Sequence, residues 1–128
     1  MKLLFDTHTF LWWNTEDPRL SARAADLIAD GKNEIFLSVA SVWEISIKAA
    51  KGKLVLPEPP EQYISNRMNL YQIQSLPVLI RHAVKVYELP AHHRDPFDRL
   101  LIAQSQAESM PLISVDSDIQ KYDVEVVW

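Results

Sequence analysis

The stretch Lys2-Leu3-Leu4-Phe5-Asp6-Thr7 decides the fold of this chain. Its short apolar run ends abruptly on an acid. Apolar runs without alternation are typical of central parallel strands that are buried on both faces. In open α/β sheets, ligands bind outside the carboxyl ends of the strands. We therefore predict a central strand at Leu3–Phe5, with Asp6 at the edge of the sheet where a ligand would bind.

Length and composition indicate one domain, spanning residues 1–128. Hydrophobic residues make up 48% of the chain, enough for a core without a disulfide or structural metal. There is no cysteine, which excludes a disulfide framework and a thiolate metal site and fits a reducing, cytoplasmic compartment. No apolar stretch approaches the length of a membrane span. Asp6 interrupts the first apolar run too early for a signal peptide.

The charge balance is acidic, with a net charge of −4. Nucleic-acid-binding proteins are expected to carry a basic surface, so this balance argues against one unless the acids cluster and a metal ion neutralises them. The only glycines, Gly31 and Gly52, fall where helices are expected to end. The sequence therefore contains no glycine-rich phosphate-binding loop.

Strand and helix patterns alternate along the chain. Strands are expected at Leu3–Phe5, Glu34–Leu37, Leu70–Ser75, Leu112–Ser114 and Val124–Val127. Helices are expected at Thr7–Trp13, Ala22–Asp30, Ser38–Lys51, Glu61–Met68, Val78–Leu89 and Pro96–Ser109, with a helical turn at Ser117–Lys121. This alternation predicts an α/β fold, a three-layer α/β/α sandwich around a parallel sheet of four to five strands.

Four acids are expected at one edge of this sheet. Asp6 ends the first strand, and Glu44 lies early in the helix after the second. Asp98 lies in the first turn of the helix that precedes the fourth strand, and Asp116 follows that strand directly. Because βαβ connections are right-handed, all four acids converge above the same edge.

Each acid also has a purely structural interpretation. Glu44 completes a capping box if Ser41 is the N-cap of its helix, but not if Ser38 is. Asp95 is a good N-cap, and Asp98 at the third helical position favours the helix dipole. Asp116 is suited to cap the helical turn at Ser117–Lys121 that follows it. The coincidence of four acids at one edge is harder to explain in this way.

A cluster of carboxylates indicates a bound cation, because close carboxylates repel and raise each other's pKa. Ligands that are all oxygen atoms favour Mg²⁺ or Mn²⁺. Such an ion binds a phosphate oxygen and activates water, which suits phosphodiester hydrolysis. An aspartyl phosphatase with Asp6 as nucleophile is a weaker alternative, since its motif needs a second aspartate where this chain has His8.

Three motifs follow one another along the chain. They are Phe5-Asp6-Thr7-His8, Ser38-Val39-Ala40-Ser41-Val42-Trp43-Glu44-Ile45 and His93-Arg94-Asp95-Pro96-Phe97-Asp98-Arg99-Leu100-Leu101-Ile102-Ala103-Gln104. In this order they resemble PIN-domain proteins, most closely the VapC-type toxins of bacterial toxin–antitoxin pairs. The resemblance spans almost the whole chain. Its third motif is highly specific, whereas Asp6-Thr7 alone is weak.

The resemblance implies a Mg²⁺- or Mn²⁺-dependent endoribonuclease that acts on RNA in the cytoplasm. It implies a type II toxin, often a homodimer, which a small antitoxin protein holds inactive and which meets DNA only through that antitoxin. It also implies the strand order 3-2-1-4-5, with the opening strand central. The alternative from another class is a non-catalytic PIN-fold module that only pairs with its antitoxin.

The resemblance also assigns the site. The family's catalytic and metal-holding acids carry over to Asp6, Glu44, Asp98 and Asp116. The auxiliary positions that it implies are Thr7, Asp95 and Asp118. The chain departs from the family at Ser114-Val115-Asp116, where many members have a Thr-Arg-Asp-like run. This departure removes one expected phosphate contact but leaves the metal site complete.

Three further residues beside the acids have open roles. Arg94 and Arg99 flank the third motif's acids and are candidates for contacting phosphate or for damping carboxylate repulsion. His93 is a candidate general base or outer-sphere metal partner. The interpretation favoured for this loop histidine is a hydrogen bond to a backbone carbonyl.

Overall fold

The computed structural model describes residues 1–128 and is built on a parallel sheet of five strands in the order β3-β2-β1-β4-β5. The strands are β1 (Lys2–Phe5), β2 (Glu34–Ser38), β3 (Gln74–Leu76), β4 (Leu112–Ile113) and β5 (Val126–Val127). β1 lies in the middle, and its Leu4 is in register with Phe36 of β2 and Leu112 of β4. The expected strand order and the central place of the opening strand are confirmed.

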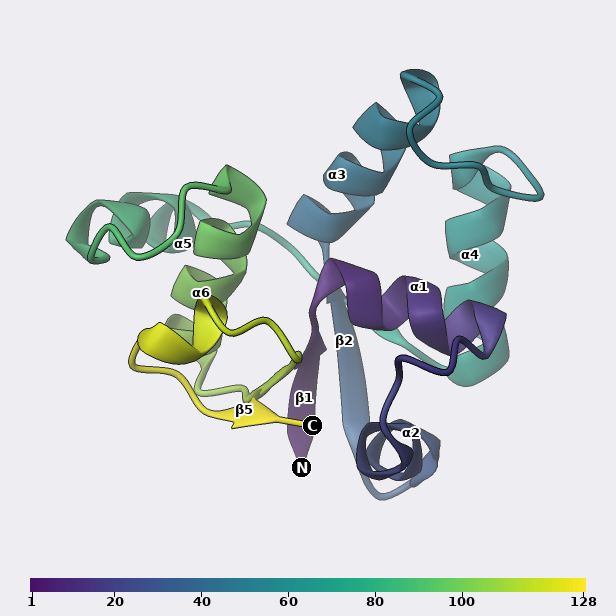
Figure 1. Ribbon diagram of the computed structural model, residues 1–128, viewed down its shortest axis with the longest axis horizontal. Coiled ribbons are helices and arrows are strands. Elements are labelled where there is room, and N and C mark those ends of the chain that lie inside the picture. The colour runs from purple at the N-terminus through teal and green to yellow at the C-terminus, as the bar shows by residue number, and fades with distance from the viewer.

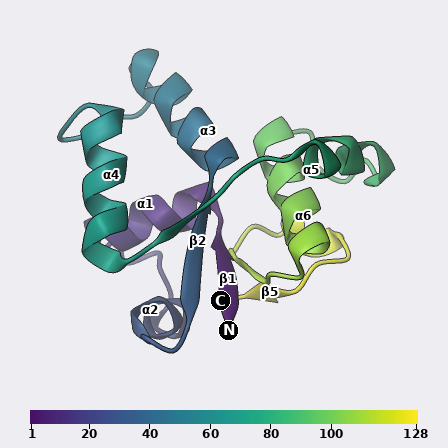
Figure 2. The same cartoon turned by 180° about the vertical axis from the view of Figure 1, so that it is seen from behind.

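Helices cover both faces of this sheet (Figures 1 and 2). The helices are α1 (Thr7–Thr15), α2 (Ala22–Ala29), α3 (Val39–Ala50), α4 (Pro60–Tyr71), α5 (Ile80–Lys85) and α6 (Pro96–Glu108), with 3-10 turns η1 (Val86–Glu88) and η2 (Ile119–Lys121). α1, α2 and α4 lie on one side of β1, and α5 and α6 lie on the other. This is the expected three-layer α/β/α arrangement.

The two faces of β1 fill two separate cores, which explains its continuous apolar run. Leu3 and Phe5 pack on one side with Phe10 of α1 and with residues of α2 and α4. Leu4 points the other way and packs with Leu101 of α6. All three β1 side chains are fully buried. The strand therefore ends in the centre of the molecule, and Asp6 is placed there with it.

The third strand was only partly located by its sequence pattern. Leu70 and Tyr71 are the last residues of α4, because Gln72 takes a left-handed conformation that ends the helix. Tyr71 packs edge-on against Trp13 of α1, and this contact favours the extra helical turn. The strand itself begins only at Gln74.

The helix expected at Val78–Leu89 is shorter and divided. It begins at Ile80, after Pro77, and gives way at Val86 to a 3-10 turn. The helix after β2 ends near its predicted limit because Gly52 adopts a positive φ of 70° that other residues rarely take. None of the helices has the length and apolar character that crossing a lipid bilayer requires.

Candidate metal-binding site

Asp6 follows β1 directly and is almost fully buried. It occupies the N-cap position of α1, but its side chain makes no capping hydrogen bond. Its Oδ2 atom accepts a hydrogen bond from the Ser114 hydroxyl at 2.8 Å, whereas its Oδ1 atom is buried without a partner. Burial raises the pKa of Asp6, and the charges of Asp116 and Glu44 raise it further. The Ser114 hydrogen bond and His8 only partly oppose this rise.

Glu44 lies in the second turn of α3 and is only 2% exposed. Ser38 is the N-cap of this helix, since its Oγ atom accepts a hydrogen bond from the amide of Ala40. The alternative in which Ser41 caps the helix and Glu44 completes a capping box is therefore wrong. The Oε2 atom of Glu44 pairs with Nζ of Lys48 at 2.6 Å, which raises the pKa of Lys48. Its Oε1 atom is buried without a partner.

Asp98 lies in the first turn of α6, and the two acids of the third motif, Asp95 and Asp98, have different roles. Asp95 is the N-cap, and its Oδ1 atom accepts hydrogen bonds from the amides of Phe97 and Asp98. The Asp98 side chain is left free to face the site. Burial, followed by the charges of Asp6 and Asp95, raises the pKa of Asp98 to about 7, although His93 lowers it.

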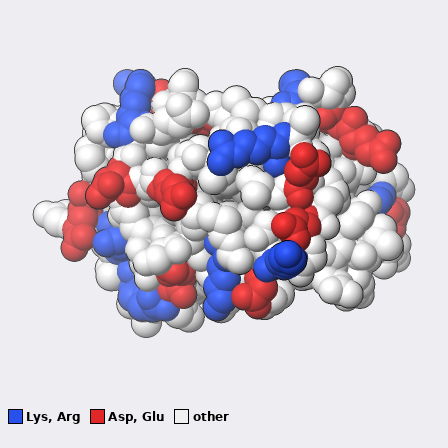
Figure 3. Space-filling model, turned by 90° about the horizontal axis from the view of Figure 1, so that it is seen from below, with Lys and Arg blue, Asp and Glu red and all other residues white.

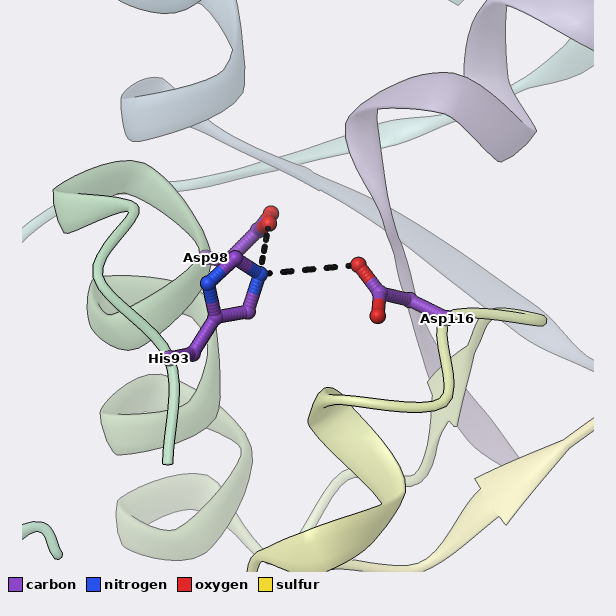
Figure 4. A group of neighbouring side chains, drawn as sticks. All are labelled: His93, Asp98 and Asp116. Atoms are coloured by element: carbon purple, nitrogen blue, oxygen red, sulfur yellow. Dashed lines mark ion pairs between the residues drawn. The ribbon is translucent and has the colours of Figure 1, made fainter. Parts of the chain in front are cut away.

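His93 lies between two of the acids (Figure 4). Its Nε2 atom is 2.9 Å from Oδ2 of Asp98 and 3.5 Å from Oδ2 of Asp116. Its Nδ1 atom accepts a hydrogen bond from the amide of Asp95, so in the neutral ring the proton is on Nε2, a buried atom that lies near the acids but makes no hydrogen bond. The interpretation of His93 as a partner of a backbone carbonyl is wrong. His93, Asp98 and Asp116 each offer a ligand atom, and these atoms lie within 4.8 Å of one another.

Ser114, at the end of β4, links two acids and was missed as a site residue by sequence reasoning. Its buried hydroxyl donates to Asp6 and accepts a hydrogen bond from the amide of Asp116 at 3.1 Å. The signal was present in the sequence: a hydroxyl residue ends a buried strand beside the one that carries Asp6. It was noted only as a departure from a family pattern.

The auxiliary residues are spread around the acids. Thr7 donates a buried hydrogen bond to Ser41 and so ties the start of α1 to α3. Asp118 pairs with Lys121, which lowers the pKa of Asp118, and only its backbone amide reaches the site, where it donates to Asp116. Arg94 is exposed.

Arg99 points away from the acids and holds the loop before α6. Its guanidinium donates to the backbone carbonyls of Val86, Leu89, Pro90 and His93 and to the hydroxyl of Tyr122. Arg99 is therefore placed neither to contact phosphate nor to reduce the repulsion between the carboxylates. Arg99 instead fixes the segment from which His93 reaches the acids.

The donors at this edge fit a divalent cation. Asp6 and Glu44 each keep one buried carboxylate oxygen with no partner, and a buried charged oxygen without a partner is costly. The acids are close enough that Asp6 and Glu44 both raise the pKa of Asp98. A cation would supply the missing partner and reverse this repulsion, and a donor set of carboxylate oxygens suits Mg²⁺ or Mn²⁺.

Comparison with known proteins identifies the family. The model of the PIN domain matches residues 3–125, almost the whole chain. The chain belongs to the PIN-domain family. Asp6, Glu44, Asp98 and Asp116 all lie within the matched residues.

Individual proteins share part of this sequence or its fold. Ribonuclease VapC16 of Mycobacterium tuberculosis is 40% identical over 70 residues, which are 52% of this chain and 48% of the relative. The chain thus spans about half the length of that relative. The fold resembles a chain in the crystal structure of VapBC2 from Rickettsia felis bound to a promoter DNA fragment (TM-score 0.71, 15% identity, 99% and 98% of the two chains). It also resembles a chain of FitAcB from Neisseria gonorrhoeae (TM-score 0.66, 18% identity, 100% and 97%).

Proposed function

We propose that this PIN-domain chain is a Mg²⁺- or Mn²⁺-dependent endoribonuclease and the toxin of a type II toxin–antitoxin pair. The observation that carries the proposal is that the charges of the four acids act on one another at one sheet edge. Two of them, Asp6 and Glu44, also keep buried, unpartnered carboxylate oxygens. A relative named as a ribonuclease, 40% identical over the matched stretch, supports the reaction class.

The residues divide the work as follows in this proposal. Asp6, Glu44, Asp98 and Asp116 hold the ion. The ion, when bound, neutralises the carboxylates and polarises the phosphodiester for attack by water. His93 orients Asp98 and Asp116 from the loop before α6, at the distances already described. Ser114 fixes Asp6 relative to Asp116, so these two acids keep their relative geometry as RNA enters.

The proposed partners are RNA, a small antitoxin and a second copy of the chain. Similar folds occur in structures named as VapBC toxin–antitoxin complexes, which supports an antitoxin partner. Contact with DNA is assigned to the antitoxin because the family resemblance implies it. With a net charge of −4, this chain meets RNA where a metal ion neutralises the acids. On the face in Figure 3, lysine and arginine side chains are interspersed with acids, so we expect RNA to be held at the metal site and not along a continuous basic surface.

The test replaces single acids in the purified protein. We expect the wild type to cleave a mixture of transfer, ribosomal and random-sequence RNA with Mg²⁺ or Mn²⁺, and not with EDTA. Asp6→Asn and Asp98→Asn should each lower the cleavage rate by more than about a hundredfold, since even outer partners of metal ligands commonly cost 10- to 100-fold. Gel analysis of the RNA measures the rate, and circular dichroism checks the fold.

Asp26→Asn is the matched control, because Asp26 is an exposed acid of α2 outside the site. It should cleave at the wild-type rate. Cleavage that persists in purified Asp6→Asn would contradict the assignment of the acids. A wild type that binds its antitoxin but cleaves no RNA would favour the non-catalytic binding module instead.

A further inference from the structure

A hollow of about 290 Å³ opens beside two of the four acids, Asp6 and Asp116. Its lining residues are Asp6, His8, Trp12, Arg19, Val115 and Asp116. Asp6 and Asp116 therefore belong both to the hollow and to the candidate metal site. The volume lies near the lower limit for small-molecule pockets, roughly 300 Å³, and suits a group the size of one nucleobase. One of its lining residues, Asp6, also carries the buried oxygen without a partner.

Aromatic rings form one wall of this hollow. The rings of Trp12 and His8 are 6.0 Å apart, and both come from α1. Trp128, the last residue of the chain, packs edge-on against Trp12 at 5.9 Å and holds it from behind. Trp12 is half-buried, whereas His8 is exposed. Of the two rings in this wall, His8 is therefore the one that meets solvent most fully.

A fixed cation stands over the same wall. The guanidinium of Arg19 lies 4.7 Å from the Trp12 ring centre. Asp17 holds it in place, accepting hydrogen bonds from Nε at 3.0 Å and from Nη2 at 2.8 Å. The Arg19 side chain is 67% exposed, and its Nη1 atom makes no hydrogen bond within the chain. Arg19 therefore presents an oriented, unused donor at the hollow.

Each of these features matches a part of a nucleotide. Flat aromatic surfaces stack against bases, and arginine adds both stacking and hydrogen bonds to base edges or phosphate. The carboxylates on the opposite side fit the place of the reacting phosphate once a cation is bound. We propose that this hollow binds the RNA nucleotide next to the cleaved phosphodiester, with its base against His8 and the Arg19 guanidinium that lies over Trp12, and with Nη1 of Arg19 as its hydrogen-bond donor.

This inference rests on the proposed ribonuclease function and goes beyond it, because it names the residues that select sequence. The acids alone treat every phosphodiester alike. Arg19 and Trp12 differ in chemistry from the acids and contact only the neighbouring nucleotide. We therefore expect the hydrogen-bond donor of Arg19 to determine which base is accepted beside the cleaved bond. Trp12 supports Arg19 and adds affinity, because stacking tolerates every base.

The first experiment observes binding without cleavage. The indole N–H signals of ¹⁵N-labelled protein in EDTA are followed by NMR as adenosine, guanosine, cytidine, uridine or ribose is added at millimolar concentration. Trp12→Phe identifies the Trp12 signal. We expect at least one nucleoside, but not ribose, to shift that signal. Arg19→Ala should weaken the response, whereas Arg67→Ala should keep it, because Arg67 stacks over Tyr63 at 5.2 Å outside the hollow.

The second experiment reads specificity from cleavage of random-sequence RNA. Sequencing of the products gives the nucleotide preference at each position beside the cleaved bond. Arg19→Ala should reduce the preference at one adjacent position by roughly 5- to 100-fold, the range for loss of one good hydrogen-bonded contact to a base edge. Trp12→Leu, which removes the ring beneath Arg19, should reduce the same preference. Arg67→Ala should reproduce the wild-type profile.

The outcomes separate this inference from the proposed function. Unchanged profiles in both variants, together with a Trp12 signal that no nucleoside moves, would overturn the inference while leaving the nuclease intact. If the wild type cleaves no RNA, the proposed function fails and the NMR titration alone decides about the hollow. A Trp12 signal that responds to acetyl-arginine amide but to no nucleoside would assign the hollow to a protein side chain and also overturn the inference.

Discussion

Asp98 is the residue whose ionisation the fold alters most clearly. Its pKa is about 7 in the folded protein, against an ordinary value of 3.8. Between these values the folded protein keeps a proton that the unfolded chain has lost. The free energy of unfolding of the metal-free protein therefore falls as the pH rises from 3.8 to about 7, and Asp98 adds no further change above that. The difference between the two values corresponds to roughly 4 kcal/mol.

Asp98→Asn removes this ionisation. In EDTA at pH 8 we expect the variant to be more stable than the wild type by roughly 1–3 kcal/mol, with the gap narrowing towards pH 4. Urea unfolding at a series of pH values measures it. Asp118→Asn is the control of opposite sign, because Lys121 lowers the pKa of Asp118 and so favours its charged form. Parallel pH profiles for the wild type and Asp98→Asn would refute this account.

Ser114 acts on two acids at once. Ser114→Ala leaves Oδ2 of Asp6 and the amide of Asp116 without their buried partner. We expect a loss of roughly 1–3 kcal/mol in stability and of roughly 10- to 100-fold in Mn²⁺ affinity, measured by urea unfolding and calorimetry. Ser105→Ala is the matched control: its buried hydroxyl donates to Met110 outside the site, so it should lose stability but keep its Mn²⁺ affinity. Equal Mn²⁺ affinities in wild type and Ser114→Ala would count against this role.

The contrast between Asp6 and His93 shows what the residue pattern encodes. Asp6 was predictable because a buried strand ends there and the strand's direction fixes the edge. The partners of His93 depend on how a loop folds back, and neither periodicity nor spacing carries that information. The role of Glu44 was only partly predictable. Its carboxylate is available to the site if Ser38 caps α3, but completes a capping box if Ser41 does. That competition is settled only by the backbone geometry.

Among the elements, the loop before α6 depends on one side chain, Arg99. Lysine cannot reproduce the planar fork that serves four carbonyls and Tyr122. We expect Arg99→Lys to lower the free energy of unfolding by roughly 2–3 kcal/mol and to speed amide hydrogen exchange in residues 86–93. RNA cleavage should slow as well, because this loop carries His93.

Arg81→Lys is the control for this change. Arg81 is largely exposed and pairs with Glu108 at the surface, so its replacement should cost less than about 1 kcal/mol. If amide hydrogen exchange in the loop of Arg99→Lys is as slow as in the wild type, the loop does not depend on Arg99 for its conformation.

The ends of helices and strands could be predicted where the residues at those ends strongly favour one backbone geometry. Asp95-Pro96 marked the start of α6 correctly, since an N-cap acid followed by proline has one favourable geometry. The start of β3 was misjudged because Leu70 and Tyr71 suit a strand by propensity, yet tertiary packing on Trp13 keeps them helical. Propensity is a weak guide wherever an aromatic contact of this kind competes with it.

At the scale of the whole molecule, the fold gathers like charges in its centre. Leu3–Phe5 of β1 are buried between two cores, and the end of the strand places Asp6 among acids from α3, α6 and the β4 loop. Conformations that separate these acids would relieve the repulsion, but the packing of both faces of the sheet opposes them. The metal-free protein therefore stores unfavourable electrostatic energy that a cation would relieve.

Binding of Mn²⁺ should accordingly stabilise the whole domain. An ion at about a hundred times its dissociation constant adds roughly 2.7 kcal/mol, which for a domain of this size raises the unfolding temperature by on the order of 5–15 °C. Thermal unfolding with increasing Mn²⁺ measures this shift. It should persist in Asp26→Asn and disappear in Asp98→Asn. Absence of a shift in the wild type would mean that the acids hold no ion without RNA, and adding a non-cleavable RNA analogue would then have to restore it for the metal site to stand.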